Sequence, residues 1–211
     1  MQRRRPFSLA PASQSSTNLT FLLLTHGAGS NRNAPLLVAV ADVFREAGID
    51  VLRYDLPFRQ ARPHGPPRPG DAARDREGLR EQILKTREKK PDRVWLGGHS
   101  YGGRQSSILA AESPELADAL LLLSYPLHPP RKPADLRTLH FPQLRTPALF
   151  VHGSRDPFGS TAELNSAIAL IPARVKLLEI EGAGHDLGRN HAAVAARIAG
   201  AFLADSMFPG P

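Results

Sequence analysis

The sequence predicts an α/β protein, with a three-layer α/β/α sandwich on a mostly parallel sheet of about six strands. Short runs rich in Leu, Val and Ile alternate along the chain with longer segments of helical periodicity. This alternation is typical of βαβ units joined by right-handed crossovers. The apolar runs are continuous, as expected for strands that are buried on both faces of a sheet.

The first half of the chain supplies two strand–helix units. Residues 19–24 form a continuous apolar run and predict the first strand. Residues 35–47 place apolar side chains on one helical face, and a glycine follows them as a stop signal. Residues 49–54 predict the second strand, and residues 71–90 predict a polar-faced helix that stops before Pro91.

The second half continues the alternation. Residues 93–96 predict a strand, which runs into a glycine-rich turn and then into helix-forming composition at 105–112. The further expected strands are 119–123, 147–151 and 175–180, and the further expected helices are 161–171 and 191–204.

Two proline-rich excursions interrupt the pattern, at residues 57–70 and 125–146. The first is too rich in proline to be expected as a regular helix or a central strand. Both excursions follow predicted strands, at the sheet edge where ligands bind in open α/β folds. They are therefore expected to form pocket walls, with ordinary long surface loops as the alternative.

Length and composition indicate one domain at residues 19–211, preceded by an N-terminal arm at residues 1–18. The basic start is not followed by the apolar core of an export signal, and no run is long enough to span a membrane. The chain has no cysteine, which excludes disulfides and cysteine catalysis. A cytoplasmic protein is expected, and both a monomer and a homodimer are compatible with the sequence.

The net charge of +7 raises the question of a nucleic-acid partner. The basic residues are scattered, with clusters at residues 3–5, 59–68 and 85–90, and none is interleaved with stacking aromatics. Nucleic-acid binding is therefore not expected. An anionic substrate or plain solvated faces would explain the charge equally well.

Residues 97–104, Gly-Gly-His-Ser-Tyr-Gly-Gly-Arg, contain the strongest chemical signal. Gly98-x-Ser100-x-Gly102 lies between a predicted strand and a predicted helix, which is the context that a nucleophile elbow requires. The flanking glycines allow strand and helix to approach closely, so that the serine hydroxyl is presented above the sheet. A glycine-rich turn without chemistry is the alternative, because this short pattern alone is weak.

Nucleophilic serine catalysis also needs a base and a carboxylate that orients the base. Asp156 follows the strand at 147–151, and His185 follows the strand at 175–180. Ser100, Asp156 and His185 therefore all fall at strand C-termini on one edge of the sheet, in the order nucleophile, acid, base. This convergence is more specific than the elbow motif, and it predicts a catalytic triad.

Several other residues compete for these roles. Asp186 is adjacent to the predicted base and would not reach the far side of its ring, and Asp118 lies near the opposite sheet edge. His152 is expected to pack behind Asp156. The other histidines in loops or at a helix start are expected to be solvated; they are His64, His128, His140 and His191. No group of His, Asp and Glu has metal-ligand spacing, so neither a metal nor a cofactor is expected.

The oxyanion of acyl transfer needs two aimed donors. The backbone N–H of Tyr101 is expected to supply one, and that of Ala28, in the glycine-bearing loop after the first strand, the other. That loop lacks both the third glycine and the later acidic residue of a dinucleotide site, and it lacks the Lys-Ser/Thr of a P-loop. A nucleotide site is therefore not expected.

Further residues are candidates for substrate binding. His26, Gly27 and His99 are expected to line the site because they flank its loop and elbow. Arg59 and Arg104 are candidates for contacting an anionic substrate group. Their alternative roles are surface solubility and, for Arg104, a structural hydrogen bond at the elbow helix.

Four segments together resemble the α/β-hydrolase superfamily. His26-Gly27, Gly98-His99-Ser100-Tyr101-Gly102-Gly103, Gly153-Ser154-Arg155-Asp156 and Gly184-His185 resemble its oxyanion loop, elbow, acid and base. The chain is similar to compact, capless dienelactone-hydrolase-like proteins. Arg104 after the double glycine, with Tyr54-Asp55-Leu56-Pro57-Phe58 earlier, resembles the testis-expressed hydrolase-like branch more closely.

The resemblance implies an α/β-hydrolase fold without a large cap, and a serine hydrolase of the esterase type acting on a small acyl substrate. Dienelactone hydrolases proper carry a cysteine nucleophile, so their lactone substrate does not transfer to a chain with Ser100. The superfamily also contains proteins without activity. A non-catalytic protein-interaction module on a hydrolase scaffold is therefore the alternative function.

Overall fold

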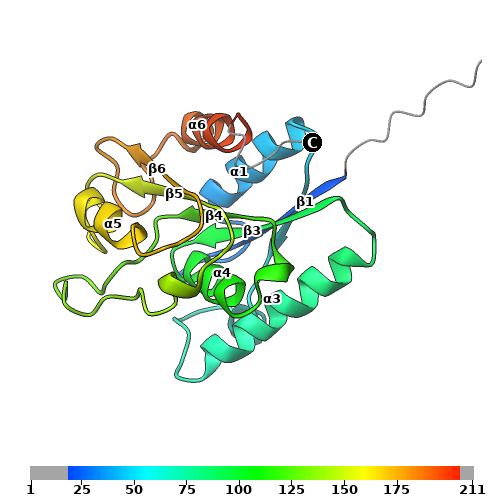
Figure 1. Cartoon of the computed structure of the whole chain (residues 1–211), viewed down its shortest axis with the longest axis horizontal. Coiled ribbons are helices and arrows are strands. Elements are labelled where there is room, and N and C mark those ends of the chain that lie inside the picture. The colour runs from blue at the N-terminus through cyan, green and yellow to red at the C-terminus, as the bar shows by residue number, and fades with distance from the viewer. Residues whose placement is uncertain (1–18, 205–211) are drawn as a thin grey trace, which may run out of the picture.

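The computed structural model describes residues 19–204 and contains a parallel six-stranded sheet with the order β2-β1-β3-β4-β5-β6 (Figure 1). Helices cover both faces of this sheet, so the predicted three-layer α/β fold is confirmed. The N-terminal arm expected at residues 1–18 lies outside the described residues.

The strands and helices follow one another as the apolar periodicity predicted. The strands are β1 Thr20–Thr25, β2 Asp50–Tyr54, β3 Arg93–His99, β4 Ala119–Leu123, β5 Ala148–Gly153 and β6 Val175–Ile180. The helices are α1 Pro35–Glu46, α2 Pro57–Ala61, α3 Asp71–Arg87, α4 Tyr101–Glu112, α5 Thr161–Ile168 and α6 His191–Leu203.

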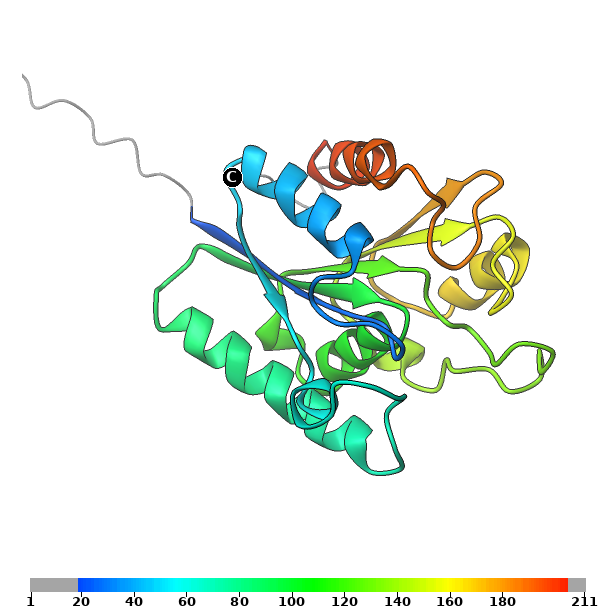
Figure 2. The ribbon, with the colours of Figure 1, turned by 180° about the vertical axis from the view of Figure 1, so that it is seen from behind.

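Two hydrophobic cores hold the layers together, one on each face of the sheet. Helices α1 and α6 lie side by side over one face, and α3, α4 and α5 cover the other (Figures 1 and 2). Successive side chains of a strand point to opposite faces, so Leu22 and Leu24 enter the α1/α6 core while Leu23 enters the other. This explains why β1 is a continuous apolar run.

The strand order reverses beside β1. The chain passes from β1 to its neighbour β2, and then crosses to β3 on the other side of β1. Loops that leave β1 and β3 therefore run apart at the carboxyl edge of the sheet, which creates the crevice where open α/β sheets bind ligands.

The prediction of no regular helix in the first proline-rich excursion was wrong, because this segment begins with a short helix, α2. Pro57 occupies its first helical position, where a missing N–H costs nothing and the fixed φ favours the helix. Phe58 and Arg59 are buried on this helix. Several ends also shifted, since α4 begins at Tyr101 rather than 105, and α3 and α5 each stop three residues earlier than expected.

Substitution of Gly102 by alanine should destabilise the fold by roughly 1–3 kcal/mol, because overpacking a tight contact has a cost of that order. A Cβ at this position would lie 2.6 Å from the backbone oxygen of His26, which cannot yield as a flexible side chain would. Gly200→Ala is the matched control, because Gly200 lies in α6 with open space around it. It should leave stability unchanged or raise it by about 0.5–1 kcal/mol through helix propensity. Urea unfolding of both variants measures the difference, and equal stabilities would contradict it.

Candidate active site

Ser100 occupies a sharp turn between β3 and α4. Its φ of 51° and ψ of −115° place it in a region that non-glycine residues rarely adopt. The turn is held from both sides, because Ser100 N–H donates to Leu123 O on β4 at 2.8 Å and Arg104 N–H donates to Ser100 O at 2.9 Å. A backbone conformation of this kind costs roughly 1–3 kcal/mol and persists only where the surroundings enforce it.

Three side chains form one continuous hydrogen-bonded chain at the sheet edge. His185 Nε2 lies 2.7 Å from Ser100 Oγ, and His185 Nδ1 lies 2.7 Å from Asp156 Oδ2. Because the carboxylate can only accept, Nδ1 carries the proton and Nε2 is left to accept from the serine hydroxyl. The structure thus brings together the three residues that the sequence predicted as a triad.

The surroundings of Asp156 and His185 fix their orientation. Asp156 is buried, and its second oxygen, Oδ1, accepts from Phe158 N–H at 2.9 Å. The Phe158 ring lies on the His185 ring with centroids 4.3 Å apart and planes inclined by 33°. The imidazole is therefore held by one carboxylate, one hydroxyl and one aromatic face.

The competing residues take other positions. The carboxylate of Asp186 accepts from Gly188 N–H, and that of Asp118 accepts from Val94 N–H near the start of β3. His152 is fully buried behind Asp156, with Nδ1 3.9 Å from Asp156 Oδ2, as predicted.

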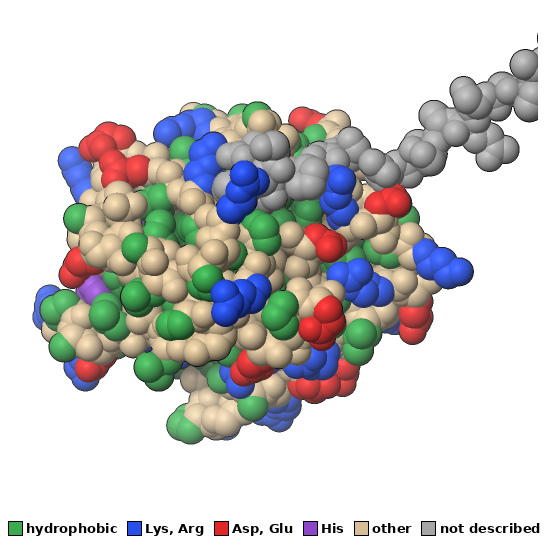
Figure 3. Space-filling model, viewed as in Figure 1, with side chains coloured by type: hydrophobic (Ala, Val, Ile, Leu, Met, Phe, Trp, Pro, Cys, Tyr) green, Lys and Arg blue, Asp and Glu red, His purple; other side chains and the backbone are tan. Residues whose placement is uncertain are grey.

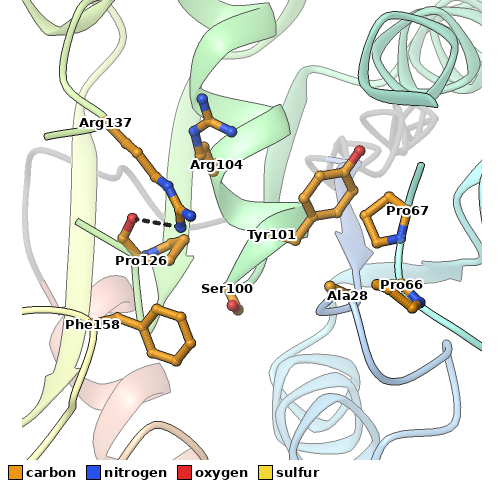
Figure 4. A pocket seen from close by; sticks show the side chains of 9 residues that line it. All are labelled: Ala28, Pro66, Pro67, Ser100, Tyr101, Arg104, Pro126, Arg137 and Phe158. Carbon is orange, nitrogen blue, oxygen red and sulfur yellow. Dashed lines mark hydrogen bonds between the residues drawn. The ribbon is translucent and has the colours of Figure 1, made fainter. Parts of the chain in front are cut away.

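Ala28 and Tyr101 line the same pocket as Ser100, and Figure 4 shows both on the side of Ser100 toward Pro66 and Pro67. Within residues 19–204 neither backbone N–H donates to a protein acceptor. Gly102 N–H donates to His26 O at 3.1 Å, which ties the loop after β1 to the first turn of α4. Two free amides are thus held beside Ser100.

His26 was expected to line the site, but the structure places it beneath the loop. Its ring is fully buried, with Nδ1 donating to Gly27 O and Nε2 accepting from Leu56 N–H at 3.1 Å. Burial lowers the pKa of His26, which favours the neutral ring that this pattern needs. His26 therefore supports the loop instead of contacting a ligand.

Arg59 was expected to contact substrate, and its position points to a different role. The side chain is buried, and its guanidinium donates to the backbone oxygens of Ser30, Ala28, Gly65 and Arg62. These bonds connect the loop after β1 to the first proline-rich excursion. The sequence could not show this role, because the acceptors are backbone oxygens, which every residue type carries.

Gly27 and His99 line a hollow beside Ser100, as expected. A Cβ on Gly27 would lie 2.9 Å from His99 Nδ1, so the close packing requires glycine there. His99 Nε2 donates to His185 O at 2.8 Å, which links the elbow to the loop that carries His185. Burial, followed by the neighbouring His185, lowers the pKa of His99 to about 4.

Ser100 opens onto two adjoining pockets. The first has a volume of about 340 Å³ and is shown in Figure 4; it is lined by Ala28, Pro66, Pro67, Ser100, Tyr101, Arg104, Pro126, Arg137 and Phe158. The second, about 310 Å³, is lined by Gly27, Ala28, Gly29, Ser30, His99, Ser100, Phe158 and His185. Both proline-rich excursions contribute to the first pocket, which confirms that they form pocket walls.

Two residues that line the first pocket, Arg137 and Phe158, were not predicted from the sequence as site residues. Arg137 lies in the second excursion among other basic residues, and nothing in the local pattern distinguishes it. Phe158 follows Asp156 by two residues, and this closeness in the sequence could have indicated that it lies near the site. His128 and His140 were expected to be solvated, yet His128 is buried and His140 half-buried, because the second excursion folds back onto α4 and α5.

The chain belongs to the alpha/beta hydrolase domain family, whose model matches residues 18–197. An alpha-beta serine hydrolase homologue from Coxiella burnetii superposes with a TM-score of 0.73 at 16% identity, covering 90% of this chain and 88% of that one. Dienelactone hydrolase from Anabaena variabilis superposes with a TM-score of 0.66 at 23% identity, covering 86% of this chain and 84% of that one. A serine hydrolase without lid from Xanthomonas campestris superposes with a TM-score of 0.67 at 17% identity, covering 88% of this chain and 83% of that one. At these identities the structures establish the shared fold.

Residues 19–204 show neither a membrane-spanning helix nor a cluster of metal ligands. None of the helices in this range is both long and apolar enough to cross a membrane. Over the same range, no three His, Asp or Glu side chains converge as metal ligands would.

His99 should make stability depend on pH. Because its pKa is about 4 in the folded protein and about 6.5 in an unfolded chain, the unfolded state binds more protons between these values. The unfolding free energy should therefore fall as pH drops from 7 to 5, and His99 should account for on the order of 1–2 kcal/mol of this loss. His99→Gln, which keeps a donor near the Nε2 position, should show a smaller loss in urea unfolding at the two pH values. Identical losses in both proteins would contradict the assignment.

Proposed function

We propose that this protein is a serine hydrolase of the esterase type, which cleaves an ester or related acyl bond of a small substrate through an acyl-enzyme on Ser100. The observation that carries the proposal is the continuous hydrogen-bonded chain from Ser100 Oγ through His185 to the buried Asp156. A base and its orienting carboxylate within hydrogen-bond reach of a hydroxyl are what activate a serine nucleophile.

The proposed reaction proceeds in two stages. Ser100 Oγ attacks the carbonyl carbon while His185 Nε2 takes the hydroxyl proton, and the same proton then passes to the departing alcohol. Water, activated by His185 in turn, attacks the acyl-enzyme and releases the acid. Asp156 keeps the Nδ1 tautomer in place and stabilises the imidazolium that forms between proton transfers.

The negative charge that develops on the carbonyl oxygen needs donors that are already in position. We assign this role to the backbone N–H groups of Ala28 and Tyr101. The bond from Gly102 N–H to His26 O and the bonds from Arg59 to Ala28 O and Ser30 O support the assignment, since they fix the loop relative to the elbow. Fixed donors avoid reorganisation during the reaction.

The size and chemistry of the pockets favour a small molecule over a polymer. Volumes of about 340 and 310 Å³ lie at the lower end of small-molecule sites. On the face shown in Figure 3, Lys and Arg side chains are interspersed with Asp and Glu and do not form the continuous basic stripe of a nucleic-acid site.

Fluorophosphonate labelling tests the proposal directly. The wild type should label, and Ser100→Ala should abolish labelling because the nucleophile is gone. Asp156→Asn should lower esterase turnover by roughly 10⁴-fold, because the base is held in the wrong tautomer, and His185→Ala by about 10⁶-fold, because the base is lost. Short-chain ester hydrolysis gives the rates, and thermal unfolding verifies that each variant folds.

Ser166→Ala is the matched control, because Ser166 is exposed on α5 and its hydroxyl donates within its own helix. It should label and turn over ester like the wild type. A folded wild type that does not label, or a Ser100→Ala variant that retains turnover, would refute the mechanism. The first result would favour a non-catalytic interaction module on the same scaffold.

A further inference from the structure

The pocket beside Ser100 contains two arginines that have no acidic partner among residues 19–204. Arg104 comes from the first turn of α4 and Arg137 from the second excursion, and Figure 4 shows both on the side of the pocket away from Pro66 and Pro67. They also share the wall between this pocket and a neighbouring one lined by Arg76 and His140.

The other described arginines differ in their partners. Seven of them form ion pairs with carboxylates; these are Arg32 with Asp55, Arg45 with Asp42, Arg62 and Arg74 with Asp71, Arg76 with Glu112, Arg80 with Glu77 and Arg87 with Asp118. In the part of the chain that the structure describes, no carboxylate lies within ion-pair distance of Arg104 or Arg137. The charge of Asp135 acts on Arg137 only weakly, and raises its pKa less than burial lowers it.

The hydrogen bonding of the pair is also incomplete. Arg104 Nε is buried without a hydrogen-bond partner, and the side-chain bond of Arg137, to Pro126 O, is long at 3.4 Å. Burial and then the positive charge of Arg104 lower the pKa of Arg137 from its ordinary value. Burial and then the charges of Arg104 and Arg76 lower the pKa of His140 to about 4, so this ring is neutral near pH 7 and adds no third positive charge. Two partly desolvated like charges raise the free energy of the empty site, and an anion would lower it.

The pockets also indicate which part of a substrate would meet the arginines. In the proposed mechanism the departing alcohol takes its proton from His185, which lines the second pocket and not the first. The alcohol part therefore belongs in the second pocket, and the acyl part in the first, beside Arg104 and Arg137. Pro66, Pro126 and Phe158 give that pocket apolar walls between the nucleophile and the guanidinium groups.

We propose that Arg104 and Arg137 form an acyl-side carboxylate subsite, so that the preferred substrates are monoesters of small dicarboxylic acids. The inference rests on the proposed function. Ser100 Oγ would form the new C–O bond to the esterified carbonyl as the alkoxy C–O bond breaks. The alcohol would leave with the proton from His185, and water would then release the dicarboxylic acid. The free carboxylate would remain on the guanidinium groups throughout, because arginine matches carboxylate geometry with paired donors.

Pairs of substrates that differ in one charge test this proposal. The acyl-side pair is the monomethyl ester of adipic acid and the analogue in which a carboxamide replaces the free carboxylate. The wild type should show a kcat/KM roughly 10- to 100-fold higher for the carboxylate member, the range expected for a charged hydrogen bond. The alcohol-side pair is the acetate ester of meta-hydroxybenzoate and that of meta-hydroxybenzamide, and here no preference for the carboxylate is expected.

Variants then assign the preference to residues. Arg104→Gln and Arg137→Gln should each lower the ratio of the two acyl-side rates toward one. Arg145→Gln removes the same charge from an exposed position in the same excursion, outside the pocket lining, and should keep the wild-type ratio.

The outcomes separate the subsite from the hydrolase reaction. Equal wild-type turnover of the charged and neutral acyl-side esters would overturn the subsite while the hydrolase proposal stands. A preference found only in the alcohol-side pair would overturn the placement of the acyl part. If no ester is cleaved, the subsite is tested by measuring the binding of adipate to Ser100→Ala by calorimetry. Binding that Arg137→Gln weakens at least about 10-fold would support the subsite, and absence of binding would overturn it.

Discussion

The close approach of three backbone segments at the elbow is the constraint on which the rest of the site depends. Gly98 and Gly102 face Thr25 and His26 at distances that leave no room for a Cβ. This contact allows α4 to start immediately after Ser100, and it forces Ser100 into its strained backbone conformation. The strain is sustained by the surrounding parallel strands, whose hydrogen bonds and buried leucines fix the turn.

A layer of buried polar residues transmits this rigidity to the loops. His26 connects the loop after β1 to the start of α2 through Leu56 N–H, and Arg59 returns from α2 to the carbonyls of the same loop. Asp75 on α3 accepts from the Tyr101 hydroxyl at 2.7 Å and from Phe58 N–H at 2.9 Å, which joins the elbow to α2 as well. Each of these groups is satisfied by several partners, as buried polar groups must be.

The charge distribution changes from the surface to the pocket. Surface arginines form ion pairs with nearby carboxylates, such as Arg45 with Asp42, and exposed pairs of this kind contribute little to stability. Arg104 and Arg137 differ because they are partly desolvated in a pocket and have no carboxylate partner among the described residues. Two of the positive charges behind the net charge of +7 therefore lie in the pocket beside Ser100. Composition alone could not distinguish them from the charges of solvated arginines and lysines.

The sequence by itself determined the parallel α/β sheet, the place of Ser100 at an elbow, and the order in which Asp156 and His185 follow it. These features depend on local periodicity and on the rule that parallel strands share one carboxyl edge. Only the tertiary structure decided the hydrogen-bonded distances between the three side chains, the supporting roles of His26 and Arg59, and the convergence of Arg137 with Arg104. Those features arise from contacts between residues far apart in the chain, many of them to backbone carbonyls and amides that every residue type carries.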